Sequence, residues 1–142
     1  MLFRSSATYG GAINDGTRSV SILRGSFTRN SATYGGAIVA GSAISVMDGT
    51  FTANSANFGG AIYGAVAAAT VSVTDGSFTD NNALFFGGAI YTADAAPVSS
   101  VGVAFARNRA TSGGGIYTTG TVSATDTSLD RKSTRLNSSH RT

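Results

Sequence analysis

Residues 44–62 read ISVMDGTFTANSANFGGAI, and close copies of this stretch follow one another along most of the chain. In each copy an asparagine comes three residues after a phenylalanine, and a double glycine then leads to a small residue and an isoleucine. Phe3 opens an early copy in which Ser6 stands at the asparagine position. The later phenylalanines are 24, 27 and 27 residues apart, a period typical of solenoid proteins. The repeated positions are Phe27, Phe51, Phe78 and Phe105; Asn30, Asn54, Asn81 and Asn108; and Ile38, Ile62 and Ile90.

Each copy contains three short segments of strand character, for example VSV (71–73), SFT (77–79) and AIY (89–91). Alternation places Val, Phe and Ile on one face of these strands and Ser, Thr, Ala and Tyr on the other. Glycines and Asp-Gly pairs separate the segments and can supply corners of positive φ. The pattern predicts an all-β fold, a right-handed single-stranded parallel β-helix of the pectin-lyase type. We expect about five coils over residues 1–129, incomplete at both ends.

Stacking of coils at the ordinary inter-strand spacing of about 4.8 Å would bring equivalent residues together. The phenylalanines then form an internal aromatic column, the isoleucines an aliphatic column, and the asparagines a ladder at one corner. Longer spacings at 65–69 and 94–100 predict loops that leave two coils. A leucine-rich repeat has a similar period, but five leucines cannot supply its leucine pattern.

The last thirteen residues, DRKSTRLNSSHRT (130–142), do not continue the repeat. Residues 130–140 match one reading frame of an adapter oligonucleotide used in sequencing libraries, so we expect a non-native, disordered tail. A genuine basic tail that binds an acidic partner is the alternative. Without the tail, six Arg face six Asp, so the formal charge of +3 belongs to the tail. We therefore expect no binding to nucleic acid.

Composition argues against several other classes of protein. The chain has no Cys, which excludes a disulfide scaffold and a Cys-based metal site. No stretch approaches the roughly 18 apolar residues of a membrane-spanning helix, so we expect no direct membrane insertion. The first residues lack the pattern of a signal peptide, and Phe3 already belongs to a repeat. We therefore expect the natural start to lie upstream of Met1.

The pairing of FxxN with GGAI resembles the repeat of the chlamydial polymorphic outer membrane proteins. The resemblance covers residues 3–129 and implies an extracellular β-helical passenger, displayed at the outer membrane by an autotransporter-type barrel and used in adhesion. It also implies host-cell or surface proteins, or glycans, as partners. The matching segments are FTRN (27–30), FTAN (51–54), FTDN (78–81) and FARN (105–108), with GGAI beginning at Gly10, Gly35, Gly59 and Gly87 and GGGI at Gly113.

One position of the repeat carries the acidic residues Asp48, Asp75 and Asp126. Asp48 and Asp75 would lie about 5 Å apart on neighbouring coils, a separation that suits paired catalytic carboxylates or part of a calcium site. We favour turn chemistry as the explanation, because both precede glycine at a corner, and Arg24 over Asp48 would be a surface ion pair. The chain has no Glu, and its one His lies in the tail. We expect no enzyme activity, metal or cofactor; a fragment of a carbohydrate-active β-helix enzyme is the alternative.

Two rows of aromatic residues flank the double glycines and are expected to face outward. Such rows can stack on sugar rings or anchor a protein partner, or they can simply stabilise neighbouring coils. We take the row after GGAI as the first candidate for ligand binding. It contains Tyr63, Tyr91 and Tyr117, and the row before the glycines contains Tyr9, Tyr34, Phe58 and Phe86.

The sequence therefore predicts a structural, adhesive segment of a surface or secreted protein, with self-association through uncapped ends. A further alternative comes from the regularly spaced hydroxyls of SFT, TFT and SFT, an array of the kind found in β-helical ice-binding proteins. Ala104 and Ala106 interrupt this array in the next copy. The double glycines do not form a phosphate loop, because GGAI lacks the Lys that such a loop requires.

Overall fold

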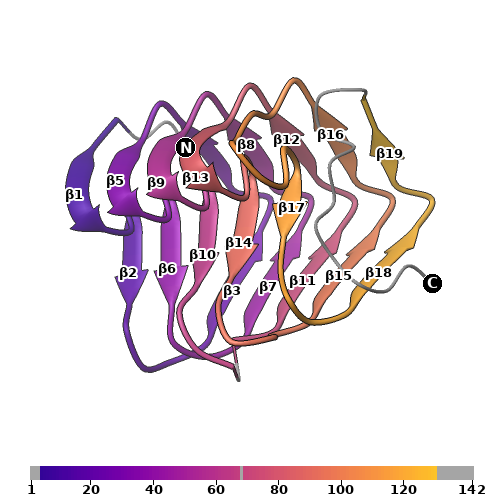
Figure 1. Ribbon diagram of the computed structural model, residues 1–142, viewed down its shortest axis with the longest axis horizontal. Coiled ribbons are helices and arrows are strands. Elements are labelled where there is room, and N and C mark those ends of the chain that lie inside the picture. The colour runs from indigo at the N-terminus through magenta and orange to yellow at the C-terminus, as the bar shows by residue number, and fades with distance from the viewer. Residues whose placement is uncertain (1–3, 68, 131–142) are drawn as a thin grey trace.

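The computed structural model describes residues 4–67 and 69–130, which form a parallel β-solenoid of about five coils (Figure 1). The described residues contain strands and turns and no helix. This confirms the predicted all-β coil architecture, while the right-handed sense of the coils stays a prediction. The predicted tail lies outside the described residues except for Asp130, and so does Phe3.

Four parallel sheets run along the solenoid, so each of the first four coils has four strands where the sequence predicted three, and the fifth coil has three. The first sheet contains β1 (Ser6–Tyr9), β5 (Ser31–Tyr34), β9 (Ser55–Phe58) and β13 (Asn82–Phe86). The second contains β2 (Ile13–Asp15), β6 (Ile38–Ala40), β10 (Ile62–Gly64), β14 (Ile90–Thr92) and β17 (Ile116–Tyr117). The third contains β3 (Val20–Leu23), β7 (Ile44–Met47), β11 (Val71–Thr74), β15 (Val98–Val101) and β18 (Val122–Thr125). The fourth contains β4 (Ser26–Thr28), β8 (Thr50–Thr52), β12 (Ser77–Thr79), β16 (Ala104–Ala106) and β19 (Ser128–Leu129).

The first sheet is the element that the sequence prediction missed. Its strands bury Ala56 and Ala83, small residues that give little hydrophobic signal. A second correction concerns the predicted loop at 94–100, which ends earlier because β15 begins at Val98. Two buried threonine hydroxyls, those of Thr92 and Thr118, donate to the carbonyl of Ala96 at 2.8 Å and hold this loop.

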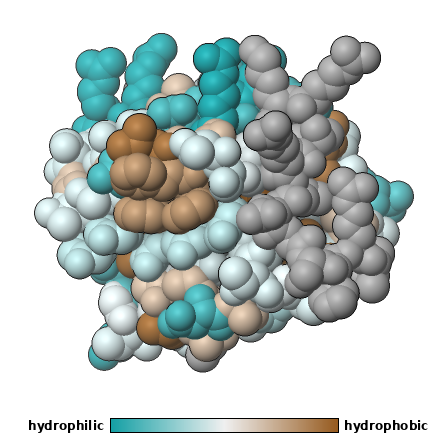
Figure 2. Space-filling model, viewed as in Figure 1, coloured by the Kyte–Doolittle hydropathy of each residue, from teal (hydrophilic) through white to brown (hydrophobic). Residues whose placement is uncertain are grey.

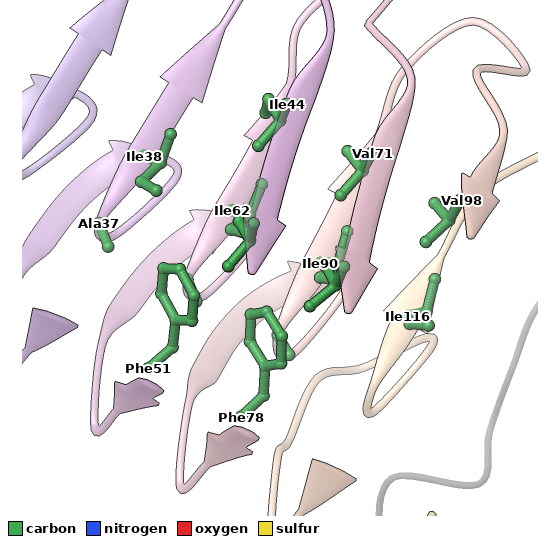
Figure 3. Packing of buried hydrophobic residues seen from close by; sticks show 14 of the residues in the cluster. Ala37, Ile38, Ile44, Phe51, Ile62, Val71, Phe78, Ile90, Val98 and Ile116 are labelled. Atoms are coloured by element: carbon green, nitrogen blue, oxygen red, sulfur yellow. The ribbon is translucent and has the colours of Figure 1, made fainter. Parts of the chain in front are cut away.

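The core consists of columns of like residues. Phe27, Phe51, Phe78 and Phe105 stack with ring centroids 4.9, 4.6 and 5.0 Å apart and interplanar angles of 8° or less. Figure 3 shows this stacking for Phe51 and Phe78, beside the isoleucines of the second sheet and the Ile44–Val71–Val98 column of the third. Burial of one such side chain stabilises the fold by roughly 1.5–3 kcal/mol.

The asparagines form a continuous buried ladder beside the phenylalanines. The amide of Asn54 donates to Oδ1 of Asn81 at 3.0 Å, and the amide of Asn81 donates to Oδ1 of Asn108 at 2.9 Å. Each of these Oδ1 atoms also accepts a hydrogen bond from the backbone N–H of the asparagine one coil earlier. In the first coil Ser6 pairs with Ser31, so Ser5 occupies the ladder column and the expectation for Ser6 was wrong.

The corners of the coils have the expected positive φ angles, but glycine is not always the residue that has them. In the Asp-Gly pairs the positive φ belongs to Asp48 (53°) and Asp75 (52°), and the glycine follows it. At the double glycine only the first residue has positive φ, for example 63° at Gly59. The second is small for another reason: a Cβ at Gly60 would lie 2.1 Å from the carbonyl oxygen of Gly88 on the next coil.

An exchange of volume in the third sheet maintains the packing of the last coils. In the middle coils Val46 and Val73 point inward, and the corner that follows is Gly49 or Gly76; a Cβ at Gly49 would lie 2.3 Å from Cγ1 of Val46. In the fourth coil the inward residue is the small Ser100, and the corner is the buried Val103. Where the inward residue of the third sheet is large, the corner residue that follows it is glycine. Where the inward residue is small, the corner residue is the branched valine.

This exchange predicts coupled substitutions. Ser100→Val alone should destabilise the fold by about 1–3 kcal/mol, because Val103 already fills the space. Ser100→Val combined with Val103→Gly restores the arrangement of the middle coils and should recover most of that loss. Urea denaturation of the single and double variants would measure the coupling, and simple additivity of the two effects would contradict the exchange.

Candidate interaction surface

The two rows of aromatic side chains meet over the glycine corner and form one continuous strip, which we call the aromatic seam. Tyr63, Tyr91 and Tyr117 are register neighbours in the second sheet, with ring centroids 5.3 and 5.6 Å apart. Rings of the other row contact them across the corner, for example Phe86 and Tyr117 at 4.6 Å. The seam consists of Tyr9, Tyr34, Phe58, Phe86, Tyr63, Tyr91 and Tyr117.

The glycines make this contact between rows possible. A Cβ at Gly87 would lie 2.8 Å from Cβ of Tyr91, and one at Gly113 would lie 2.7 Å from Cβ of Tyr117. Any larger residue at these corners would push the tyrosine away from its neighbours. The GGAI motif therefore shapes both the corner and the aromatic surface beside it.

The orientation of the rings decides what the seam offers to a ligand. Tyr34 is stacked between Tyr9 and Phe58 with interplanar angles of 10° and 9° and centroid distances of 5.1 and 5.3 Å. Its two ring faces are thus covered by neighbours, and stacking on a sugar needs an open face. The candidate row Tyr63, Tyr91 and Tyr117 is half-buried, with tilted rings in mutual contact. Much of the seam therefore joins neighbouring coils.

Burial in the seam raises the pKa of the Tyr63 phenol, with the neighbouring Tyr91 adding to the effect, and burial likewise raises the pKa of Tyr91. Because the folded state favours the neutral phenols, their contribution to stability is complete below the ordinary tyrosine pKa and is lost as pH rises through the raised value. We expect the wild-type chain to lose stability more steeply above about pH 10 than the Tyr63→Phe/Tyr91→Phe variant. Urea midpoints measured across the alkaline range would show this, and equal slopes would contradict it.

A β-bulge next to the seam exposes two large apolar side chains. β13 has five residues where β5 and β9 have four, and its register with β9 shifts between Ala83 and Phe86. Leu84 and Phe85 in this bulge are 56% and 42% exposed, and the Phe85 ring lies 5.3 Å from that of Phe58. In Figure 2 an apolar patch lies over β13. We call Leu84 and Phe85 the exposed pair.

The fifth coil holds the bulge in place. The hydroxyl of Thr111 donates to the carbonyl of Leu84 at 2.8 Å, and the N–H of Ser112 donates to the carbonyl of Phe85 at 3.0 Å. The backbone of the inserted residue is thus hydrogen-bonded although its side chain is exposed. Sequence reasoning missed this feature, whose one signal is the spacing from asparagine to glycine: six residues from Asn81 to Gly87 and five in the other copies.

Charged side chains around these surfaces form few pairs. The guanidinium of Arg107 donates to both carboxylate oxygens of Asp80 at 2.8 Å, which lowers the pKa of that carboxyl. This is the ion pair found among residues 4–67 and 69–130. The expected pair of Arg24 with Asp48 is not formed, and both residues are exposed.

The aspartates at the corner after the third sheet do not form a catalytic or metal site within the described residues. Asp48 and Asp75 lie at neighbouring corners and are exposed, and Gly102 separates Asp75 from Asp126 in the column. No group of three potential metal ligands occurs in the part of the chain that the structure describes.

The hydroxyl array of the fourth sheet is in register over three coils and is interrupted at Ala104 and Ala106. Nor does a helix long and apolar enough to cross a membrane occur among the described residues.

Comparison with known families identifies the repeat. Residues 48–65 and 75–93 match the sequence profile of the Chlamydia polymorphic membrane protein repeat. Each matched segment runs from an Asp-Gly corner through FxxN and GGAI to three residues beyond GGAI, and so spans strands of the fourth, first and second sheets in one turn of the solenoid. Searches of curated proteins and of solved structures gave no significant match. Two segments of the chain, one in each of two consecutive turns of the solenoid, are thus similar to the Chlamydia polymorphic membrane protein repeat.

Proposed function

We propose that the chain is a segment of a surface-displayed adhesin at the outer membrane, and that it binds host-cell or surface proteins through its lateral faces. The repeat family supports a membrane-associated parent protein, and the solenoid supports long regular faces. No catalytic role is proposed for the chain. Host glycans remain the second class of partner, and the covered ring faces of the seam make them the less favoured one.

The exposed pair is the observation that carries this proposal. A bulge interrupts a regular ladder, and bulges are found where a side chain must be re-aimed. Large apolar side chains exposed together are typical of protein interaction sites, and aromatic residues dominate their binding energy. Phe85 fits the role of an anchor, with the seam beneath it and Arg109 beside Asn82 on the adjoining coil as a polar rim.

Deletion of Phe85 gives a sharp test. It leaves NALF before the double glycine, the same length as the SATY and SANF strands, so the coil should remain folded and about as stable. We expect the deletion to weaken binding of the labelled chain to host cells about tenfold or more. Flow cytometry over a concentration series measures this binding, and urea denaturation checks the fold.

The matched control is Val66→Ser. Val66 is 40% exposed, close to the value for Phe85, and lies outside the seam in the turn that follows β10. Its substitution should leave binding unchanged. Equal binding by the wild-type chain and the Phe85 deletion would contradict a role of the exposed pair in binding. Binding lost on enzymatic removal of cell-surface glycans, with the Phe85 deletion neutral, would favour the glycan alternative.

A further inference from the structure

The outer face of the third sheet carries no charge and is built from two columns of different size. None of the strands β3, β7, β11, β15 and β18 contains a charged residue. One outward column is small and consists of Ser21, Ser45, Ser72, Ser99 and Ser123. The other is larger and consists of Leu23, Met47, Thr74, Val101 and Thr125. Leu23, Met47 and Val101 are 62%, 50% and 41% exposed.

We propose that this face binds a second copy of the same chain. A two-fold axis parallel to the solenoid axis reverses the strand direction while keeping each coil at the same height. The larger column of one copy then lies on the serine column of the other, coil by coil. The small serines leave room for the larger side chains, as in other interdigitated sheet packings. The face therefore complements itself, which is the requirement for a two-fold interface.

The charged residues near this face lie outside the proposed contact. Arg24, Asp48, Asp75 and Asp126 follow the last residue of their strands, at the corner with the fourth sheet. The fourth sheet is also uncharged, but its outward columns are serine and threonine in the first three coils, which favour hydration over burial. The third sheet is thus the flat face with apolar residues to bury.

The area of this face determines how tightly two copies of the chain are expected to bind each other. Four residues along the strand and five coils give a footprint of roughly 13 Å by 24 Å. A stable interface usually buries about 800 Å² on each partner, so the contact should be weak. We expect a dimer with a dissociation constant on the order of 100 µM.

Sedimentation velocity of the full chain, from about 10 µM to about 1 mM, tests the proposal. The wild-type chain should pass from monomer to dimer over this range, and Met47→Glu should lose this step. The control is Thr50→Glu, which places the same charge at an exposed position of the neighbouring sheet in the same coil and should still dimerise. A monomer at all concentrations, or a dimer unaffected by Met47→Glu, overturns the proposal. So does an open series of larger species that is the same in the wild-type chain and in Met47→Glu, because such a series indicates end-to-end stacking alone.

Cross-linking tests the orientation independently, because the wild-type chain has no Cys. In the proposed dimer, position 45 of one copy faces position 47 of the other. A mixture of Ser45→Cys and Met47→Cys chains should form mixed disulfides at least several-fold faster than either variant alone. Equal rates for the mixture and the separate variants would contradict the two-fold arrangement.

Discussion

Substitution of Gly60 by alanine should destabilise the solenoid by at least about 3 kcal/mol, at or above the upper end of the usual cost of overpacking. The added Cβ would lie 2.1 Å from the carbonyl oxygen of Gly88 and 2.8 Å from the backbone nitrogen of Asn82. Both obstacles are backbone atoms of the next coil, so no side-chain rotation relieves the contact. The coils would have to separate, which breaks the hydrogen bonds between them.

Gly16→Ala provides the matched control, because nothing lies within 4 Å of a Cβ built at Gly16. Its effect should fall within about 0.5 kcal/mol, the usual range for surface substitutions. Urea denaturation followed by circular dichroism compares the two variants with the wild-type chain. Equal stability of Gly60→Ala and Gly16→Ala would show that the coils do not approach as closely as the structure places them.

Substitution of Asn81 by aspartate should cost about 3 kcal/mol or more at neutral pH. Asn81 is fully buried, and its amide nitrogen donates to the carbonyl of Phe51 at 2.9 Å as well as to Asn108. A carboxylate has the same shape but no donor, so it would place a buried charge opposite two acceptor oxygens. Because Asn81 is hydrogen-bonded to Asn54 on one side and to Asn108 on the other, its replacement should disturb three consecutive coils.

The pH dependence separates this mechanism from simple loss of packing. Burial favours the neutral acid, so the pKa of the introduced carboxyl should be raised in the folded state. The destabilisation should then be largest at neutral pH and become smaller as pH falls and the acid regains a donor. Asn81→Leu cannot titrate and serves as the control. Parallel pH profiles for the two variants would refute the proposed role of the amide donor.

The repeat period predicted most of the interior, because each buried column depends on one residue type at a fixed spacing. Phe51 over Phe78 and Asn54 beside Asn81 follow directly from that spacing. The first sheet was not predicted, since its inward residues are alanines, which do not produce a strong strand pattern. Counting from Phe3 placed Ser6 in the ladder, whereas the first coil is 25 residues long by its pairing of Tyr9 with Tyr34.

The surface was harder to predict than the core. A period identifies which residues face outward, and it does not show that two rows meet across a glycine corner. The stacked rings of Tyr34 and Phe58 reveal that the seam joins coils, which the sequence left open. The bulge at β13 changes the spacing by one residue, and only pairing with β9 shows that Leu84 and Phe85 become exposed.

Every feature described above depends on coils stacked in parallel register, and a pair of introduced cysteines tests this directly. Thr50 and Ser77 are register partners on the outer face of the fourth sheet, 27 residues apart in sequence. Thr50→Cys/Ser77→Cys should form an intramolecular disulfide on mild oxidation of a dilute sample, because neighbouring strands bring their Cα atoms about 5 Å apart. Ser26→Cys/Ser77→Cys, two coils apart, should remain reduced. Efficient cross-linking of the second pair, or none of the first, would contradict the solenoid.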